Sequence, residues 1–185
     1  APRAIHNDQR QSTALNFSLG DAYPESILEG LDVNQTQEVL KIVANIATLK
    51  ELKLTFIKGL QISSLPDGLQ YLDCRGCHGL WIDEDAIPSS LARLNLSACA
   101  LVGLPDYLSK LTRLQELLLY KNSIKTIKDE LLPSSLCRLS LYRNNITDLH
   151  LRLSKLPSLA NLNVGANPLM NLSLDHGNKS QFINK

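Results

Sequence analysis

The sequence predicts an α/β solenoid, a curved horseshoe with a parallel β-sheet on its concave side, short convex return segments and an N-terminal helical cap. The first observation is a pattern, Leu-x-x-Leu-x-Leu-x-x-Asn/Cys-x-Leu, that recurs six times over residues 49–170. The second is its spacing, because successive copies begin 20 to 23 residues apart, and internal repeats of this length are typical of solenoids. The third is an amphipathic helical pattern within residues 24–48.

Each copy of the pattern predicts one strand. Its leucines alternate with other residues, and alternate side chains of a strand point to the same side. Stacked copies would place their strands about 4.8 Å apart in a parallel sheet and bury a continuous core that no single copy can bury alone. Proline in several connecting segments favours extended or short 3₁₀ returns. The six copies begin at Leu49, Leu69, Leu91, Leu114, Leu136 and Leu159.

The ninth position of the pattern predicts a structural ladder. The chain turns inward there, so the side chain has to satisfy buried backbone groups, and an asparagine amide offers both a donor and an acceptor. Cysteine replaces asparagine in two central repeats. The position is occupied in order by Ile57, Cys77, Cys99, Asn122, Asn144 and Asn167.

The stretch CRGCHG, residues 74–79, has the Cys-x-x-Cys-His spacing of a c-type haem attachment site. The repeat register argues against a haem or metal site, because it points Cys74 and Cys77 into the core and His78 outward. We therefore expect no cofactor, and inward cysteines favour a reducing, cytosol-like compartment. The chain also has no glycine-rich phosphate loop and only four scattered histidines, so we expect no enzymatic activity.

The chain divides into three expected parts. Residues 1–48 form an N-terminal cap, residues 49–170 hold about six repeats, and residues 171–185 form a tail or a weak cap. Residues 14–19 alternate like a strand, and residues 34–47 carry a helical apolar face that Asn34 would cap. A shorter helix is expected at 24–31, with Pro24 in its first turn. An open alternative is that residues 1–48 form a longer, helix-backed first repeat. At the other end, either the parent protein continues or the tail folds over the last repeat.

The pattern is that of a leucine-rich repeat. Segments with proline, LPDGL at 65–69, IPSSL at 87–91 and LPSSL at 132–136, share the chain with the longer LSKLTRL at 108–114 and LSKLPSL at 153–159. This mixture resembles the leucine-rich-repeat domains of effectors that pathogenic bacteria inject into host cells. The resemblance implies a secreted, non-enzymatic module that binds a host protein in the host cytosol.

Two alternatives to that interpretation stay open. Some members of the effector family carry a large ubiquitin-ligase domain after the repeats, and only sixteen residues follow Leu169. The chain would then be the substrate-recognition domain of a larger enzyme. It would otherwise be a fragment of a eukaryotic leucine-rich-repeat regulator or receptor.

The outward positions of the strands, on the concave face of the expected horseshoe, predict the binding face. Tyrosine and arginine are enriched at interface hot spots, and Tyr120 and Tyr142 are expected side by side on neighbouring repeats. The alternative is cross-strand packing that only stabilises the sheet. Around this pair the repeat register places Leu118, Lys121, Arg138 and Arg143. A second candidate group, toward the N-terminal end, comprises Phe56, Tyr71, Arg75 and the single tryptophan, Trp81.

Composition limits the classes of partner that we expect. The chain has 185 residues and a formal net charge of +1, so it shows no general electrostatic attraction to nucleic acid or to an anionic membrane. No apolar run approaches the roughly 20 residues that a membrane span needs. We therefore expect a protein partner, no nucleic acid and no membrane span, and we favour a monomer.

Overall fold

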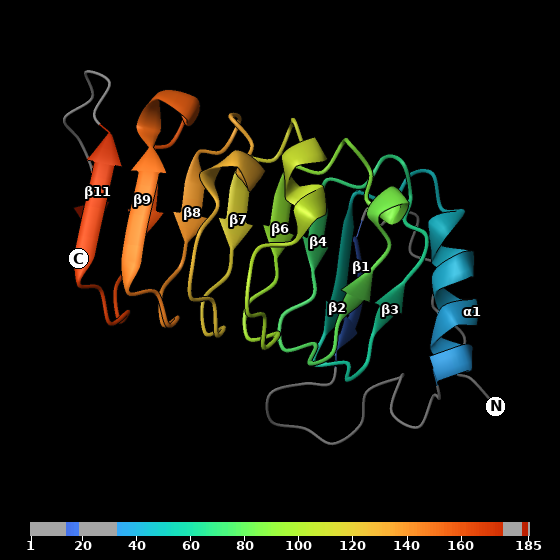
Figure 1. Ribbon diagram of the computed structural model, residues 1–185. Coiled ribbons are helices and arrows are strands. Elements are labelled where there is room, and N and C mark those ends of the chain that lie inside the picture. The colour runs from blue at the N-terminus through green and yellow to red at the C-terminus, as the bar shows by residue number, and fades with distance from the viewer. Residues whose placement is uncertain (1–13, 19–32, 176–182, 185) are drawn as a thin grey trace.

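The computed structural model describes residues 14–18, 33–175 and 183–184, and its main element is a parallel sheet of eight strands. Every neighbouring pair in this large sheet is parallel, which confirms the α/β class and the parallel sheet. Figure 1 shows β6, β7 and β8 side by side. In spatial order the strands are β1 (Ala14–Ser18), β2 (Glu51–Thr55), β4 (Tyr71–Asp73), β6 (Arg93–Asn95), β7 (Glu116–Leu118), β8 (Arg138–Ser140), β10 (Asn161–Asn163) and β12 (Ile183–Asn184).

The strands of the large sheet pair equivalent positions of neighbouring repeats. Each strand pairs its fourth-position leucine with the fourth-position leucine of the next strand, and all these leucines are buried. A slip of one residue would turn the leucines to the solvent, so their burial holds the register. The paired leucines are Leu52, Leu72, Leu94, Leu117, Leu139 and Leu162.

The segments that return from one strand to the next form the second layer of the molecule. Two small parallel sheets lie in it, β3 (Gln61–Ile62) with β5 (Trp81–Ile82), and β9 (Asp148–Arg152) with β11 (Asn171–Asp175). In Figure 1, β9 and β11 run opposite to β7 and β8. Short 3₁₀ helices, as expected, supply the other returns: η1 (Glu84–Ala86), η2 (Asp106–Lys110), η3 (Asp129–Leu131) and η4 (Leu153–Lys155).

The N-terminal part supplies one strand and the single α-helix of the described residues. β1 pairs with β2 in the repeat register, with residue 15 opposite Leu52 and residue 17 opposite Leu54. Helix α1 (Val33–Ala44) buries Leu40 and Val43 and lies beside β3 (Figure 1). The helix therefore includes Asn34, which was expected to cap it from outside. A strand in repeat register followed by a helix favours a helix-backed first repeat. The shorter helix that was expected at 24–31 lies outside the described residues.

The C-terminal part continues the strand pattern instead of only closing it. β11 adds to β9 in the second layer, and β12 adds to β10 in the large sheet. Leu162 lies opposite residue 183. The described residues after position 170 thus repeat the order of one return strand and one sheet strand.

Asparagine side chains at the ninth position tie each repeat to the one before it. The amide nitrogen of Asn144 donates to the carbonyl oxygens of Leu119 and Leu141, at 2.9 and 3.0 Å, and its oxygen accepts from the N–H of Ile124 at 3.1 Å. Leu119 belongs to the preceding repeat and Leu141 to the same repeat. Asn122 and Asn167 make the same kinds of bond, to the carbonyls of Leu96 and Leu141 of the repeats before them.

The cysteines at the ninth position also make the bond to the preceding repeat. The thiol of Cys77 donates to the carbonyl oxygen of Leu54 at 2.7 Å, and that of Cys99 donates to the carbonyl of Cys74 at 3.0 Å. These carbonyls occupy the same repeat position as those that receive the bonds from asparagine. A thiol has one weak donor, whereas an amide has two donors and an acceptor, so the cysteine repeats are joined by fewer bonds.

One ion pair stabilises the second layer. The guanidinium of Arg152 binds both carboxylate oxygens of Asp129, with Nε–Oδ2 at 2.7 Å and Nη2–Oδ1 at 2.5 Å. The backbone N–H of Arg152 donates to the same carboxylate at 3.2 Å. Asp129 is only 7% exposed. The bonds from Arg152 hold the pKa of Asp129 well below its usual range, although burial acts in the opposite direction.

We expect Asn144→Ala to lower the free energy of unfolding by roughly 1–3 kcal/mol, because it leaves buried backbone groups without partners. Asn144→Cys should lose less, because Cys77 and Cys99 make the equivalent bond to the preceding repeat. Urea unfolding followed by circular dichroism measures both. Equal stability of the alanine variant and the wild type would contradict the ladder.

We expect Asp129 to make stability depend on acid pH. Its pKa is lowered in the folded state, so its contribution is complete above its unfolded value of about 4 and is lost as the pH falls below that value. The difference in melting temperature between the wild type and Asp129→Asn should therefore shrink from pH 7 to pH 3. Asp106→Asn, at an exposed carboxylate, is the control. A difference that stays constant with pH would refute the role of the ion pair.

Candidate protein-binding face

Tyr120 and Tyr142 lie at equivalent positions where β7 and β8 end. The N–H of Lys121 donates to the carbonyl of Tyr142 at 2.9 Å, which joins the two segments side by side. Both tyrosines are half-buried. Within the described residues their hydroxyl groups make no hydrogen bond, and no ring contact joins the two rings. The alternative interpretation, cross-strand packing that only stabilises the sheet, stays open beside the binding interpretation.

The residue that follows each tyrosine has a left-handed backbone conformation. The eighth position of the repeat has a positive φ in all six copies, and φ is 55° at both Lys121 and Arg143. This turn ends the strand and leaves both basic side chains exposed. Glycine suits the conformation best, and other residues adopt it at a cost of about 1–2 kcal/mol. The other members are Phe56, Gly76, Ala98 and Ala166.

Two further members of the first candidate group lie beside the tyrosines. Leu118 is half-buried at the end of β7, and Arg138 is exposed at the start of β8. The guanidinium of Arg138 pairs with the carboxylate of Glu116 across the two strands, at 3.1 Å. Such a surface pair contributes only about 0–1 kcal/mol, so Arg138 can exchange this carboxylate for one on a partner. Arg143 lies 5.4 Å from the centre of the Tyr142 ring.

Tyr71, from the second group, belongs to a polar network inside the sheet surface. The guanidinium of Arg93 lies 4.3 Å from the centre of the Tyr71 ring and reaches Glu51 at 2.8 Å. The hydroxyl of Tyr71 donates to Asp73 at 3.1 Å. Burial, with a smaller effect of the Asp73 charge, raises the pKa of Tyr71 to about 12. The ring and the hydroxyl group of Tyr71 thus both already have partners within the protein.

Phe56 and Arg75 pack against each other on the neighbouring repeats. The guanidinium of Arg75 lies 5.3 Å from the centre of the Phe56 ring. The ring lies directly over Gly76, where an added Cβ would be only 2.3 Å from Cδ1 of Phe56. Gly76 therefore serves two needs, a positive φ of 76° and room for the ring.

Trp81 does not join the other members of the second group. It lies in β5, which pairs with β3 in the second layer, whereas Phe56, Tyr71 and Arg75 belong to the large sheet or its strand ends. Its side chain is 54% exposed, in agreement with its expected place outside the core. The structure thus brings together the first candidate group and divides the second.

The CRGCHG cysteines lie in the core, as the repeat register predicts. Cys74, Cys77 and Cys99 are buried free thiols, and His78 is exposed. Burial raises the pKa of Cys77 to about 12 and that of Cys99 to about 11, which keeps these thiols protonated and unreactive. Over residues 33–175 and the two described terminal strands, no group of three or more His, Cys, Asp or Glu could hold a metal ion.

Sequence reasoning missed a second set of strand-end contacts on the same face. Side-chain oxygens at the fifth position accept the backbone N–H two residues later, in three repeats. The bonds run from Arg75 to Asp73 at 3.0 Å, from Ser97 to Asn95 at 3.1 Å and from Gly165 to Asn163 at 3.1 Å. The sequence contains a signal for these bonds, since Asp and Asn two residues before a turn commonly form them.

Comparison of the chain with models of known families and with curated protein sequences finds no match in either. Among the described residues, no helix has the length and apolar character that crossing a membrane requires. We call the large-sheet surface that carries Tyr120 and Tyr142 the outer face. Its side chains are therefore the basis for assigning a function.

We expect Gly76→Ala to destabilise the fold, because its Cβ overlaps Phe56 and because its left-handed backbone costs about 1–2 kcal/mol. In a Phe56→Ala background the overlap is absent and only the backbone cost should remain. A double-mutant cycle measured by urea unfolding should give a coupling of about 0.5–3 kcal/mol. Additive effects would show that the ring does not lie over Gly76.

Proposed function

We propose that this chain is a leucine-rich-repeat solenoid and a non-enzymatic protein-recognition module, which binds a partner protein through the outer face of its large sheet. One observation carries the proposal. Tyr120 and Tyr142 lie side by side at the strand ends, half-exposed, with hydroxyl groups that bond to no described residue, and each is followed by an exposed basic side chain.

The regularity of the strands supports the solenoid. Consecutive repeats pair leucine to leucine in the large sheet, and the ninth-position side chain donates to the same carbonyl of the preceding repeat five times. Such a fold offers a binding surface whose backbone is ordered before the partner arrives. Less conformational entropy is then lost on binding than with a mobile loop.

The chemistry of the tyrosine pair suits a protein interface. Each ring can bury apolar area while its hydroxyl forms a new hydrogen bond, and tyrosine and arginine are enriched among residues that dominate binding energy. Leu118 adds an aliphatic contact between the two strands. Arg138 and Arg143 can offer planar, bidentate donors to a carboxylate.

The proposed setting is a bacterial effector acting in the cytosol of a host cell. The buried free thiols and the proline-containing segments between repeats support this proposal. The same face would serve if the chain were the substrate-recognition domain of a larger enzyme, such as a ubiquitin ligase, or part of a eukaryotic regulator.

We expect Tyr120→Ala/Tyr142→Ala to abolish capture of the partner from a lysate of candidate host cells, because the two rings form the centre of the interface. Affinity capture followed by mass spectrometry measures the loss. Trp81→Ala is the matched control, because it removes an exposed aromatic ring from the other layer. If the double variant keeps the wild-type melting temperature and every partner, the proposed face is wrong.

A further inference from the structure

The turns that follow the strands of the large sheet carry basic side chains and no acidic ones. We call these six segments, 55–60, 75–80, 97–102, 120–125, 142–147 and 165–170, the strand-end turns. Their charged residues are Lys58, Arg75, Lys121, Lys125 and Arg143, with His78 as a further titratable group. Because the strands are parallel, all six turns lie along one edge of the molecule.

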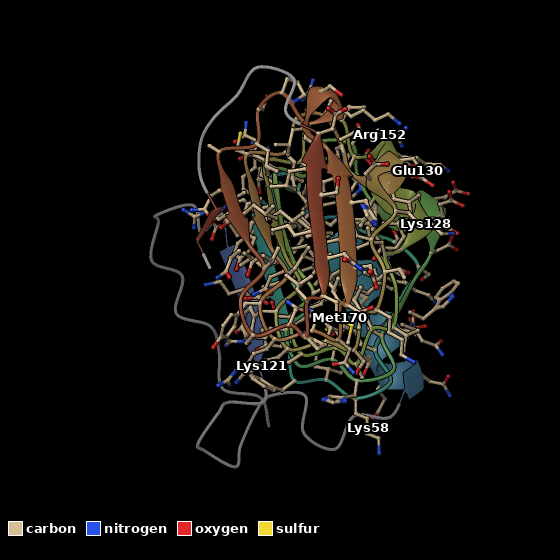
Figure 2. All side chains as sticks on the ribbon, turned by 60° about the vertical axis from the view of Figure 1, so that its left-hand side comes forward. Lys58, Lys121, Lys128, Glu130, Arg152 and Met170 are labelled. Carbon is tan, nitrogen blue, oxygen red and sulfur yellow. The ribbon has the colours of Figure 1, made fainter. Side chains whose placement is uncertain are left out.

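The opposite edge has a different charge pattern. The 3₁₀ helices and their first turns carry acidic residues such as Glu84 and Glu130, and two of the basic residues there pair with acids, Lys110 with Glu84 at 2.6 Å and Arg152 with Asp129. Figure 2 shows Lys58 and Lys121 toward one end of the view and Glu130 and Arg152 toward the other. The net charge of the whole chain is modest, but its charged side chains are therefore distributed unevenly between the two edges.

Four of the basic side chains in the strand-end turns have no charge partner within the described residues. Lys58, Lys121, Lys125 and Arg143 are exposed and form no ion pair there. The arginines higher on the same sheet differ, because they pair with glutamates of the sheet itself. The turns at 120–125 and 142–147 therefore hold three exposed cations, Lys121, Lys125 and Arg143, that form no ion pair among the described residues.

The fold does not need cations at these turns. Lys121 and Arg143 occupy the same position on neighbouring strands, about 5 Å apart along the sheet, so their charges repel. Ala98 and Ala166 occupy the same left-handed position in other repeats. A neutral side chain is therefore accepted at this position. Among the described residues, the one ring contact, ion pair or side-chain hydrogen bond of either cation is the contact of Arg143 with the Tyr142 ring.

We propose that the strand-end turns at 120–125 and 142–147 bind an acidic segment of the partner protein. This inference rests on the proposed function and identifies the chemistry of its ligand. Lys121, Lys125 and Arg143 would contact closely spaced carboxylates, while Tyr120 and Tyr142, directly beside them, would receive the side chains between those carboxylates. Charge complementarity of this kind increases the association rate and excludes basic partners.

A protein segment fits this surface better than a nucleic acid. Binding to a phosphate backbone draws its strength from many neutralised phosphates along a continuous basic track. Here the central turn, 97–102, has no charged residue, so the cations of the two neighbouring turns at 120–125 and 142–147 form a short, separate cluster. A cluster of three cations matches a few carboxylates on one short segment.

The test uses the whole chain and defined probes at low ionic strength. The probes are a short fluorescein-labelled peptide of alternating glutamate and glycine, the same peptide with glutamine for glutamate, and a short oligouridine RNA. Fluorescence anisotropy measures affinity, and amide chemical shifts in NMR spectra locate the contact. We expect the glutamate peptide to bind, to shift the amides of residues 120–125 and 142–147, and to weaken with added salt.

Matched variants separate the basic cluster from charge in general. Lys121→Ala/Arg143→Ala should weaken binding of the glutamate peptide by about tenfold, because two charge-assisted contacts are lost. Lys128→Ala/Lys155→Ala, which removes the same charge from exposed residues outside the strand-end turns, should leave it unchanged. No binding, equal binding of the glutamine peptide, shifts elsewhere or tighter binding of the RNA would each overturn the inference.

Failure of this inference and failure of the proposed function give different results. If the glutamate peptide does not bind but the tyrosine variant still loses the captured partner, the face binds a protein through other chemistry. If the glutamate peptide binds at the cluster but the tyrosine variant keeps every partner, the basic cluster is real and the tyrosine-centred interface is wrong.

Discussion

The hydrogen bond from the ninth-position side chain to the preceding repeat is the interaction on which the rest of the structure depends. It turns the chain inward at the end of each strand and joins each repeat to its neighbour, as in the bond from Asn144 to the carbonyl of Leu119. Because the bond recurs at the same position, the residues just before it are aligned from one repeat to the next across the sheet. The tyrosines and basic residues of the outer face are aligned by this ladder.

The ladder is uneven along the molecule, and the unevenness coincides with the candidate face. The second and third repeats use thiols, each of which donates a bond to the preceding repeat, and the first repeat has Ile57, which has no side-chain donor. Asn122 and Asn144 each donate one bond to the preceding repeat and one within their own repeat, and each also accepts. Tyr120 and Tyr142 stand two residues before these asparagines. Turns held by an asparagine of the ladder therefore carry the side chains that we assign to binding, as a preorganised interface requires.

Features that repeat could be predicted from the sequence, and features that occur once could not. The strand register, the ladder and the inward cysteines follow from a pattern with six copies. The bidentate pair of Asp129 with Arg152 forms between return segments that share no pattern. The stacking of Arg93 on Tyr71 depends on which way a long side chain turns, and alternation along a strand does not fix this. The second candidate group is divided because Trp81 lies in β5 of the second layer.

Native-state hydrogen exchange of the backbone amides that donate to the ladder asparagines tests the central claim most directly. The N–H groups of Ile124 and Ile146 lie in turns, outside any strand, and donate to the side-chain oxygens of Asn144 and Asn167 at 3.1 Å. If the ladder joins the repeats, both amides exchange as slowly as that of Leu119, whose N–H is bonded between strands. Exchange as fast as that of the exposed amide of Val102 would contradict the account.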